Sequence, residues 1–371
     1  MSKRIKVMTI FGTRPEAIKM APLVLELKKR PNQFETIVTV TAQHREMLDQ
    51  VLKIFKITPN YDLNIMKQKQ TLVQITNRTL EGLDKIMKNE KPDIVLVHGD
   101  TSTTFTASLA AFYNQIAIGH VEAGLRTWNK YSPFPEEMNR QLTSIMADLH
   151  FSPTEKSKQN LLKENKPEDR IFVTGNTAID ALKTTVDDAY SHPILDKIGA
   201  KRLVLVTAHR RENLGENMQQ MFKAIKRLVE THDDIRVVYP VHLNPAVQKT
   251  AEDILGHDDR IQLIKPLDVV DFHNFIANAY LILTDSGGIQ EEAPSLGVPV
   301  LVLRNTTERP EGIEAGTLKL TGTNEDTIFN MANELLLDHK LYQEMAQAKN
   351  PYGDGQASRR IADAIVAFFN R

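Results

Sequence analysis

The chain has no cysteine among its 371 residues. This absence excludes a disulfide framework and a catalytic thiol, and it is typical of proteins from a reducing compartment. No apolar run approaches the roughly 18 residues that a membrane span requires. The first residues, MSKRIKVMTIFGTRPE, contain an apolar segment that is too short for a signal peptide. We therefore expect a cytoplasmic protein with no membrane partner.

An excess of one charge is also missing. The 46 Lys and Arg residues nearly balance the 47 Asp and Glu residues, and the formal net charge is -1. This balance gives no electrostatic reason to expect nucleic acid or an anionic membrane surface as a partner. Hydrophobic residues make up 41% of the chain, as in an ordinary globular protein, and the length suits about two domains.

Familiar cofactor and metal motifs are absent as well. No G-x-G-x-x-G opens a βαβ unit, and the nearest approach, at 353–355, follows no predicted strand. The sequence contains no P-loop, no H-E-x-x-H helix and no obvious carboxylate cage for magnesium. We therefore expect no nicotinamide, no metal and no other cofactor, so that side chains alone carry the chemistry.

What the chain does contain is a regular alternation of apolar strands and helices, which predicts buried parallel sheets in an α/β fold. We expect two Rossmann-like domains that face a central cleft. The first comprises residues 1–170 with the C-terminal helix 355–371, and the second comprises 171–354, because a polar, proline-containing stretch interrupts the pattern at 163–170. The predicted strands lie at 5–11, 36–41, 93–98, 117–122, 171–174, 202–207, 235–239, 261–264, 280–284 and 298–303, and the predicted helices include 20–29, 71–89, 217–230 and 357–369.

Polar clusters follow six of the apolar runs at once: FGTRPEAIKM, VHGDTSTT, VEAGLRT, TAHRREN, PVHLNP and TDSGGIQEE. Open parallel sheets bind their ligands outside the carboxyl ends of the strands. The six clusters therefore predict a binding site that both domains contribute to.

Carboxylates and cations dominate the clusters of the first half. Asp100 could simply cap the next helix, and a glutamate such as Glu136 is favoured at a helix N-terminus in any case. Glu122, however, ends a strand that should otherwise be apolar. If these three acids share one cleft, repulsion and burial raise at least one pKa and provide a general acid or base. Arg14 and Lys19 flank a βα turn that suits a phosphate, although a capped turn with surface cations would look the same.

The clusters of the second half suit a nucleotide diphosphate. His209 stands beside two arginines, an environment that fits pyrophosphate better than a core, although a lone histidine is more often structural. Ser286, Gly287 and Gly288 separate a strand from a helix and allow the backbone to approach a phosphate. Glu292, about one helical turn further on, could accept hydrogen bonds from a ribose.

Seven segments together carry a family resemblance: GTRPEAIKMAP, VHGDTSTTF, GHVEAGLRT, FPEEMNRQ, TAHRRENLG, VYPVHLNP and TDSGGIQEEAPSLGVPVL. In this order and spacing, over nearly the whole chain, they closely resemble the non-hydrolysing bacterial UDP-N-acetylglucosamine 2-epimerases. The resemblance implies a glycosyltransferase-B-like fold, a homodimer, and reversible conversion of UDP-N-acetylglucosamine into UDP-N-acetylmannosamine. Such activity supplies cell-surface polysaccharides, including teichoic acid linkage units in some bacteria.

Chemistry favours one route for that reaction. Carbon 2 of the sugar has no adjacent carbonyl, so direct removal of its proton is too costly. Two alternatives to direct deprotonation remain, namely transient oxidation of the sugar by a nicotinamide and departure of the neighbouring UDP. The missing dinucleotide motif favours departure of UDP. Elimination of UDP would give a 2-acetamidoglucal beside UDP, and re-addition with a proton on the opposite face would give the epimer.

The resemblance also implies roles for individual residues. Asp100, Glu122 and Glu136 would serve the proton transfers, on faces that the sequence does not assign, and His209 would assist the departing pyrophosphate. Leu267, through its backbone, and Phe272 would form a uracil pocket. The other implied UDP-sugar contacts are Arg14, Lys19, Ser286, Gly287, Gly288, Glu292 and Arg309.

Some relatives are activated by a second UDP-N-acetylglucosamine beside the active site. The matching positions here are Gln43, Glu46, Lys69, Glu136, Arg210 and His242. Glu46 stands where glutamine is usual and Lys69 where arginine is usual. Because a lysine does not reproduce a bidentate guanidinium contact, we expect activation that is weaker than in those relatives.

Three other functions remain open at this point. A retaining glycosyltransferase would use the same nucleotide site but needs fewer groups that handle protons. A hydrolysing epimerase would release free N-acetylmannosamine and UDP. A non-catalytic nucleotide-sugar sensor would have to bury carboxylates at a cost and without a use.

Overall fold

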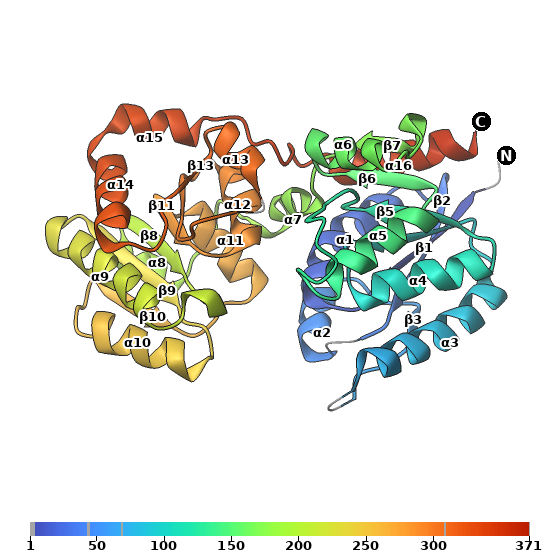
Figure 1. Ribbon diagram of the computed structural model, residues 1–371, viewed down its shortest axis with the longest axis horizontal. Coiled ribbons are helices and arrows are strands. Elements are labelled where there is room, and N and C mark those ends of the chain that lie inside the picture. Colours follow the sequence, from blue (N-terminus) through green and yellow to red (C-terminus); the bar gives the residue numbers. More distant parts are fainter. Residues whose placement is uncertain (1–3, 43–44, 68–69, 308, 371) are drawn as a thin grey trace. The chain divides into compact units, whose positions relative to one another are not determined.

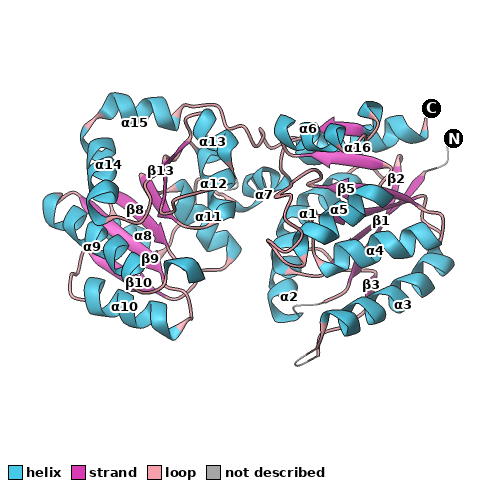
Figure 2. Ribbon diagram, in the orientation of Figure 1, coloured by secondary structure: helices cyan, strands magenta, loops and turns pink. Residues whose placement is uncertain are grey.

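The computed structural model describes residues 4–42, 45–67, 70–307 and 309–370. The chain folds into two compact units: unit 1 is Met1–Thr184 with Tyr352–Arg371, and unit 2 is Thr185–Pro351. Each unit is a parallel sheet with helices on its faces (Figures 1 and 2). No helix within the described ranges has the length and apolar character of a membrane span.

The sheet of unit 1 has the order β3-β2-β1-β4-β5-β6-β7, and every neighbouring pair is parallel. Its strands are β1 (Ile5–Phe11), β2 (Phe34–Val40), β3 (Tyr61–Asp62), β4 (Ile94–His98), β5 (Ala117–Val121), β6 (Leu149–Ser152) and β7 (Ile171–Val173). The order of the strands reverses between β1 and β4. The carboxyl ends of these two strands therefore form the switch point where open α/β sheets bind ligands.

Helices cover both faces of this sheet, which explains why its strands are apolar on both sides. On one face α1 and α16 pack against Val7, Leu96 and Phe151, and on the other α3 and α4 pack against Met8 and Val97. The helices of unit 1 are α1 (Arg14–Lys28), α2 (Arg45–Ile54), α3 (Leu72–Glu90), α4 (Ser102–Tyr113), α5 (Glu136–Met146), α6 (Glu155–Lys163), η1 (Glu168–Arg170), α7 (Thr177–Thr185) and α16 (Ala357–Phe369).

Unit 2 repeats the plan, with the all-parallel order β10-β9-β8-β11-β12-β13 and a switch point between β8 and β11. Its strands are β8 (Arg202–Thr207), β9 (Ile235–Pro240), β10 (Ile261–Ile264), β11 (Leu281–Thr284), β12 (Val300–Val302) and β13 (Leu318–Leu320). Its helices are α8 (Pro193–Ile198), η2 (Arg211–Asn213), α9 (Glu216–Thr231), α10 (Pro245–Leu255), α11 (Val269–Ala277), α12 (Gly287–Glu292), η3 (Ala293–Leu296), α13 (Pro310–Glu314), α14 (Glu325–Leu337) and α15 (His339–Ala346).

The α/β class and the two parallel sheets agree with the prediction, and each predicted strand corresponds to an observed one. The boundary between the units differs. Residues 171–184, predicted to open the second domain, belong to unit 1 because β7 pairs with β6 and extends the first sheet. The polar stretch at 163–170 therefore lies within unit 1, where it runs from the end of α6 through η1 to β7.

Candidate active site

Glu122 lies directly after β5, at the carboxyl edge of the unit 1 sheet. Its φ of 63° is in the left-handed region, which residues other than glycine rarely adopt and which costs on the order of 1–3 kcal/mol. Its carboxylate pairs with Lys19 of α1, and it accepts a hydrogen bond from Asn176 Nδ2 at 3.2 Å. Strain of this kind at a polar residue is typical of functional sites.

A buried histidine stands behind this carboxylate. Nε2 of His98, the last residue of β4, lies 3.7 Å from Glu122 Oε2. Burial lowers the pKa of His98 to about 4, so the ring is neutral at neutral pH. His98 therefore adds no positive charge, and Lys19 supplies the cation beside Glu122.

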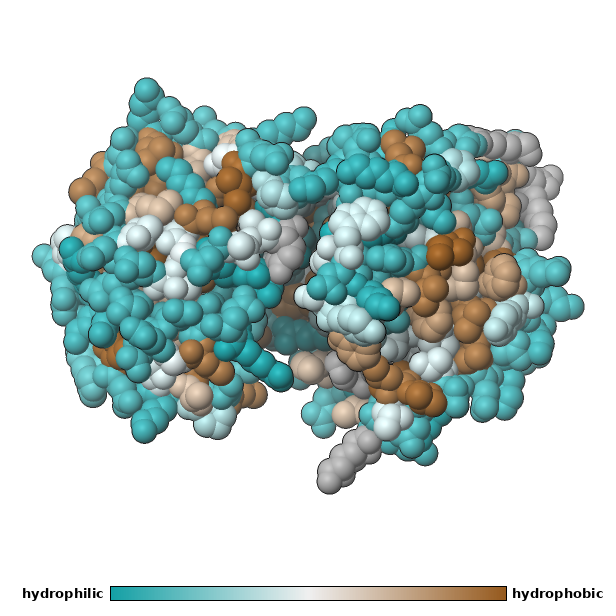
Figure 3. All heavy atoms as spheres, in the orientation of Figure 1, coloured by the Kyte–Doolittle hydropathy of each residue, from teal (hydrophilic) through white to brown (hydrophobic). Residues whose placement is uncertain are grey.

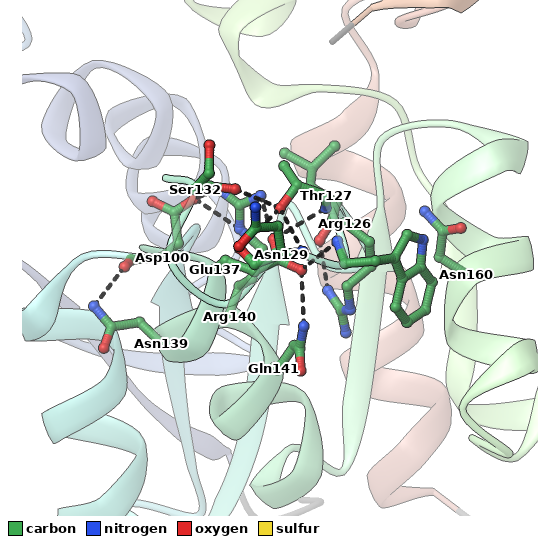
Figure 4. Close-up of polar contacts among 12 residues, drawn as sticks. Asp100, Arg126, Thr127, Asn129, Ser132, Glu137, Asn139, Arg140, Gln141 and Asn160 are labelled. Atoms are coloured by element: carbon green, nitrogen blue, oxygen red, sulfur yellow. Dashed lines mark hydrogen bonds and ion pairs between the residues drawn. The ribbon is translucent and has the colours of Figure 1, made fainter. Parts of the chain in front are cut away.

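Asp100 occupies the turn between β4 and α4, close to the same edge. Arg140 of α5 donates to Asp100 Oδ2 through Nε at 3.0 Å, and Asn139 Nδ2 donates to the backbone oxygen of Asp100 at 2.9 Å (Figure 4). Burial raises the pKa of Asp100, Arg140 opposes that shift, and the charges of Glu122 and Glu136 add to it. The charges of both predicted glutamates thus act on Asp100 at the edge of one sheet.

Adjacent glutamates at the start of α5 have different environments. Glu136 is the first residue of the helix and is partly exposed. The side chain of Glu137 is fully buried and accepts from the backbone N–H groups of Thr127 at 3.1 Å and Trp128 at 3.0 Å (Figure 4). Arg140 Nη1 also donates to Glu137 at 3.1 Å. Glu137 therefore holds the preceding loop, and Glu136 remains available at the sheet edge.

Glu16 is a central residue of this region that the sequence analysis did not select. Its buried carboxylate accepts from Gly12 N at 3.0 Å, from Thr13 N and Oγ1 at 2.8 Å, and from Thr101 Oγ1 at 2.6 Å. Burial raises the pKa of Glu16, while these hydrogen bonds lower it. Glu16 thereby joins the turn after β1 to the turn that carries Asp100. The T-x-x-E spacing from Thr13, a helix-capping pattern, was the available signal.

In unit 2, Asp285 organises the loop that carries His209. Asp285 is fully buried after β11 and accepts from the backbone N–H groups of His209, at 3.0 Å, and Arg210, at 2.9 Å. It also accepts from Asn213 Nδ2 at 3.0 Å, and its Oδ1 lies 3.3 Å from His209 Nδ1. Burial lowers the pKa of His209, and Asp285 opposes the shift. The predicted ligand loop is thus fixed by Asp285, which belongs to the TDSGGIQEE cluster but was not predicted to hold this loop.

A pocket of about 450 Å³ lies at this edge of the unit 2 sheet. The rings of His209 and His242 stack within it, with centroids 5.6 Å apart. Its lining combines cationic and small polar groups, namely His209, Arg210, Arg211, His242, Asn244, Ser286 and Gly287. Such a lining suits a bound anion with several oxygens.

The other predicted contacts of unit 2 come from several elements of that unit. Arg309 Nε donates to Glu291 at 2.7 Å, and the Arg309 guanidinium lies over Gly287, where an added Cβ would come within 2.6 Å of Nη1. Glu292 Oε2 lies 3.7 Å from His273 Nε2. Leu267 and Phe272 are partly buried against the core on the α11 side of the sheet. Ser286 precedes α12, whose first residues are Gly287 and Gly288.

The remaining predicted positions lie in unit 1. Arg14 opens α1 and is half-buried. Of the predicted activator positions, Gln43 and Lys69 lie outside the described residues, and Glu46 is exposed near the start of α2. Arg210 and His242 belong to the unit 2 pocket described above. The activator site stays a prediction.

Among the described residues, no cluster of three or more His, Asp or Glu side chains is arranged to hold a metal ion. Both sheets have the strand order of Rossmann-like folds. Acidic side chains lie at the carboxyl edge of one sheet, and a cationic pocket lies at that of the other. These features define a glycosyltransferase-B-like nucleotide enzyme.

Comparison with known proteins identifies the family. The sequence model of UDP-N-acetylglucosamine 2-epimerase matches residues 25–366. The Bacillus subtilis (strain 168) UDP-N-acetylglucosamine 2-epimerase is 67% identical over 364 residues, covering 98% of this chain and 96% of the relative. The chain therefore belongs to the UDP-N-acetylglucosamine 2-epimerase family.

Solved structures agree with this assignment. S. aureus MnaA, whose structure contains UDP, is 58% identical with a TM-score of 0.90, over 99% of this chain and 97% of that one. The Neisseria meningitidis UDP-GlcNAc 2-epimerase, solved with UDP-GlcNAc, is 49% identical with a TM-score of 0.87, over 98% of this chain and 100% of that one.

Proposed function

We propose that this protein interconverts UDP-N-acetylglucosamine and UDP-N-acetylmannosamine by elimination and re-addition of UDP. The observation that carries the proposal is the strained Glu122, paired with Lys19 beside Asp100, in a chain of this family. Carboxylates held next to cations at a switch point can remove and return protons, and the elimination route needs both steps.

The proposal assigns the proton transfers to unit 1. Glu122, Asp100 and Glu136 act at carbon 2 and at the departing oxygen, without a fixed assignment of faces. Because burial raises the pKa of Asp100 and Arg140 lowers it, this group is suited to change its protonation during turnover. Arg14 and Lys19 are proposed as phosphate contacts from the same edge, where Lys19 also pairs with Glu122.

The proposal assigns the nucleotide to unit 2. His209, held by Asp285, would stabilise the pyrophosphate as it leaves, and Arg309 would add a positive charge. The backbone at Ser286, Gly287 and Gly288 can approach the phosphates closely because it carries little or no side chain. Glu292 is proposed to bind the ribose, and Leu267 with Phe272 to bind the uracil.

Incubation with UDP-N-acetylglucosamine alone in deuterated water tests this mechanism. We expect deuterium at carbon 2 of both intact UDP-sugars, because the proton that is removed exchanges with solvent before one returns. NMR of carbon 2 and mass spectrometry of the UDP-sugars measure this result without any added coenzyme.

The same experiment separates the rival functions. Free N-acetylmannosamine with UDP would identify a hydrolysing epimerase. UDP-sugar that binds but acquires no deuterium would identify a sensor or a glycosyltransferase awaiting its acceptor. A requirement for added nicotinamide would contradict the elimination route. The family match favours the epimerase over these alternatives.

We also propose that the protein is a homodimer. Exposed apolar side chains gather on α3, α4 and α5, where Val73, Phe112, Tyr113 and Ile145 are each more than half exposed. α4 packs beside both α3 and α5, and Figure 3 shows apolar side chains over this face of unit 1. An apolar patch of this kind marks a protein interface.

Sedimentation tests the dimer directly. We expect the wild type to sediment as a dimer and the variant Phe112→Asp to shift toward the monomer, because a charge would be buried without a partner. A matched change at Leu337, an exposed apolar residue of α14 in unit 2, should leave the dimer intact. A wild type that is monomeric at micromolar concentration would contradict the proposal.

A further inference from the structure

Asn176 connects three parts of unit 1 and is buried between β7 and α7, with 3% of its surface exposed. Its Nδ2 donates to Glu122 Oε2 at 3.2 Å. Its Oδ1 accepts from Ala178 N at 2.9 Å, at the start of α7. Its backbone N–H donates to the oxygen of Tyr352 at 2.7 Å. One residue thus contacts the strained carboxylate, a helix end and a distant part of the chain.

That distant part is where the chain returns from unit 2. The chain leaves unit 1 after Thr184, at the end of α7, and re-enters it at Tyr352. Gly353 packs against Gly175 so closely that an added Cβ would lie 3.2 Å from Gly175 Cα. The exit and the return are therefore held together at Asn176.

A second contact strengthens this junction. Asp180 of α7 accepts from the backbone N–H groups of Ala357, at 3.2 Å, and Ser358, at 2.7 Å, at the start of α16. The exit helix α7 is thus tied to the helix that follows the return. The contacts at Asp180 and at Asn176 itself thus hold the segment that carries the Asn176 amide.

We propose that Asn176 is a positioning residue that orients Glu122 and couples this carboxylate to the two connections between the units. The inference rests on the proposed function, in which Glu122 transfers a proton. Lys19 stabilises the negative charge of Glu122, but its long side chain is flexible and does not fix the orientation of the carboxylate. The hydrogen bond from the Asn176 amide fixes that orientation. The positive φ of Glu122 is unfavourable, and it persists only where contacts from the surrounding structure hold it.

Two substitutions separate orientation from helix capping. Asn176→Ser keeps an acceptor for the start of α7, because serine is a good N-cap residue, but its side chain is too short to reach Glu122. Asn176→Asp keeps the cap and places a second carboxylate against Glu122. A residue that only caps α7 would tolerate both changes.

We expect Asn176→Ser to lower kcat about 10- to 100-fold, the factor for one hydrogen bond to a charged group, with KM and UDP affinity near wild type. We expect Asn176→Asp to move the acid limb of the kcat/KM profile to higher pH, because the added negative charge disfavours ionised Glu122. The other charged or titratable groups that face this site, Lys19, His98 and Asp100, are unchanged in both variants. Wild-type kcat and an unshifted profile in both variants would overturn the proposal.

The coupling to the chain connections is tested with Gly353→Ala. Gly353 has a φ of 129°, and the added methyl group would push the return segment away from Gly175. We expect a loss of kcat similar to that of Asn176→Ser, and no further loss when the two changes are combined, because they act through one contact. If the two losses of kcat multiply in the double variant, the proposed coupling is overturned.

Gly316→Ala is the matched control, because Gly316 also has a positive φ, of 79°, but no atom lies within 4 Å of the added Cβ. It should share the backbone strain and keep the wild-type kcat. Thermal unfolding of each variant shows whether a lost rate reflects lost folding. Absence of deuterium exchange in the wild type would contradict the proposed function itself, whereas exchange that is equal in wild type and Asn176→Ser would contradict only the role of Asn176.

Discussion

Glu122→Gln is expected to lower the rate of epimerisation about 10²- to 10⁴-fold, the usual contribution of a positioned acid or base. Glutamine has the size of glutamate but does not take up a proton, and it removes the negative charge that pairs with Lys19. UDP affinity should change far less than the rate, because most of the nucleotide contacts are proposed in unit 2 and the proposed phosphate contacts of unit 1, Arg14 and Lys19, are retained. Initial rates and calorimetric titration with UDP measure the two effects.

Glu35→Gln provides the control for this change. Glu35 is 44% exposed and pairs with Arg4 and Lys6 near the start of β2, away from the carboxyl ends of the strands. Its rate should equal that of the wild type. Deuterium exchange in Glu122→Gln should fall with the rate. A variant that retains more than about a tenth of the wild-type rate would remove Glu122 from the proton transfers.

Arg140→Met is expected to lower the free energy of unfolding by about 3–5 kcal/mol, the typical cost of removing one partner from a buried ion pair. Arg140 bridges Asp100 and the fully buried Glu137, and both carboxylates would lose their cation. Urea unfolding measures the change. Lys88→Met, which removes only an exposed pair with Asp84, should leave the unfolding midpoint unchanged.

This loss of stability should depend on pH in a definite direction. Burial raises the pKa of Asp100 in the folded protein above its value of 3.8 in the unfolded chain, and loss of Arg140 raises it further. A folded pKa above the unfolded one favours folding at low pH, and that advantage disappears as the pH rises through the folded pKa. The variant should therefore lose less stability at pH 4 than at pH 7, and its acid limb of kcat/KM should lie at higher pH. An equal loss at both pH values would contradict this account of Asp100.

The sequence was sufficient for most strands of both sheets and for the edge where the site is proposed. Apolar runs that end in polar clusters located β1, β4 and β5 in unit 1 and β8, β9 and β11 in unit 2, because buried parallel strands have few alternatives. Strands β3, β6 and β13 were not predicted. β3 is a pair of residues, and β6 carries the polar residues His150 and Ser152 inside the sheet, which hides its pattern.

The supporting contacts of the site were harder to predict. Glu16 and Asp285 act through hydrogen bonds to backbone N–H groups of neighbouring turns, and the folded chain alone brings these turns together. Lys19 was expected at a phosphate, and the structure pairs it with Glu122 across 103 positions of sequence. Asn176 was not selected, because one polar residue after a short strand has no distinctive pattern.

Unit 1 is built from two segments of the chain, and in the sequence the whole of unit 2 lies between these segments. Ile361, Ala362 and Ile365 of α16 complete the apolar core against α1, so this core stays open until the last helix is made. During synthesis on the ribosome, the unit that begins first is thus completed last, while the contiguous unit 2 can already fold. Until α16 is made, the newly synthesised chain exposes the apolar surface of unit 1 that α16 later covers. This surface would be a binding site for chaperones during that interval.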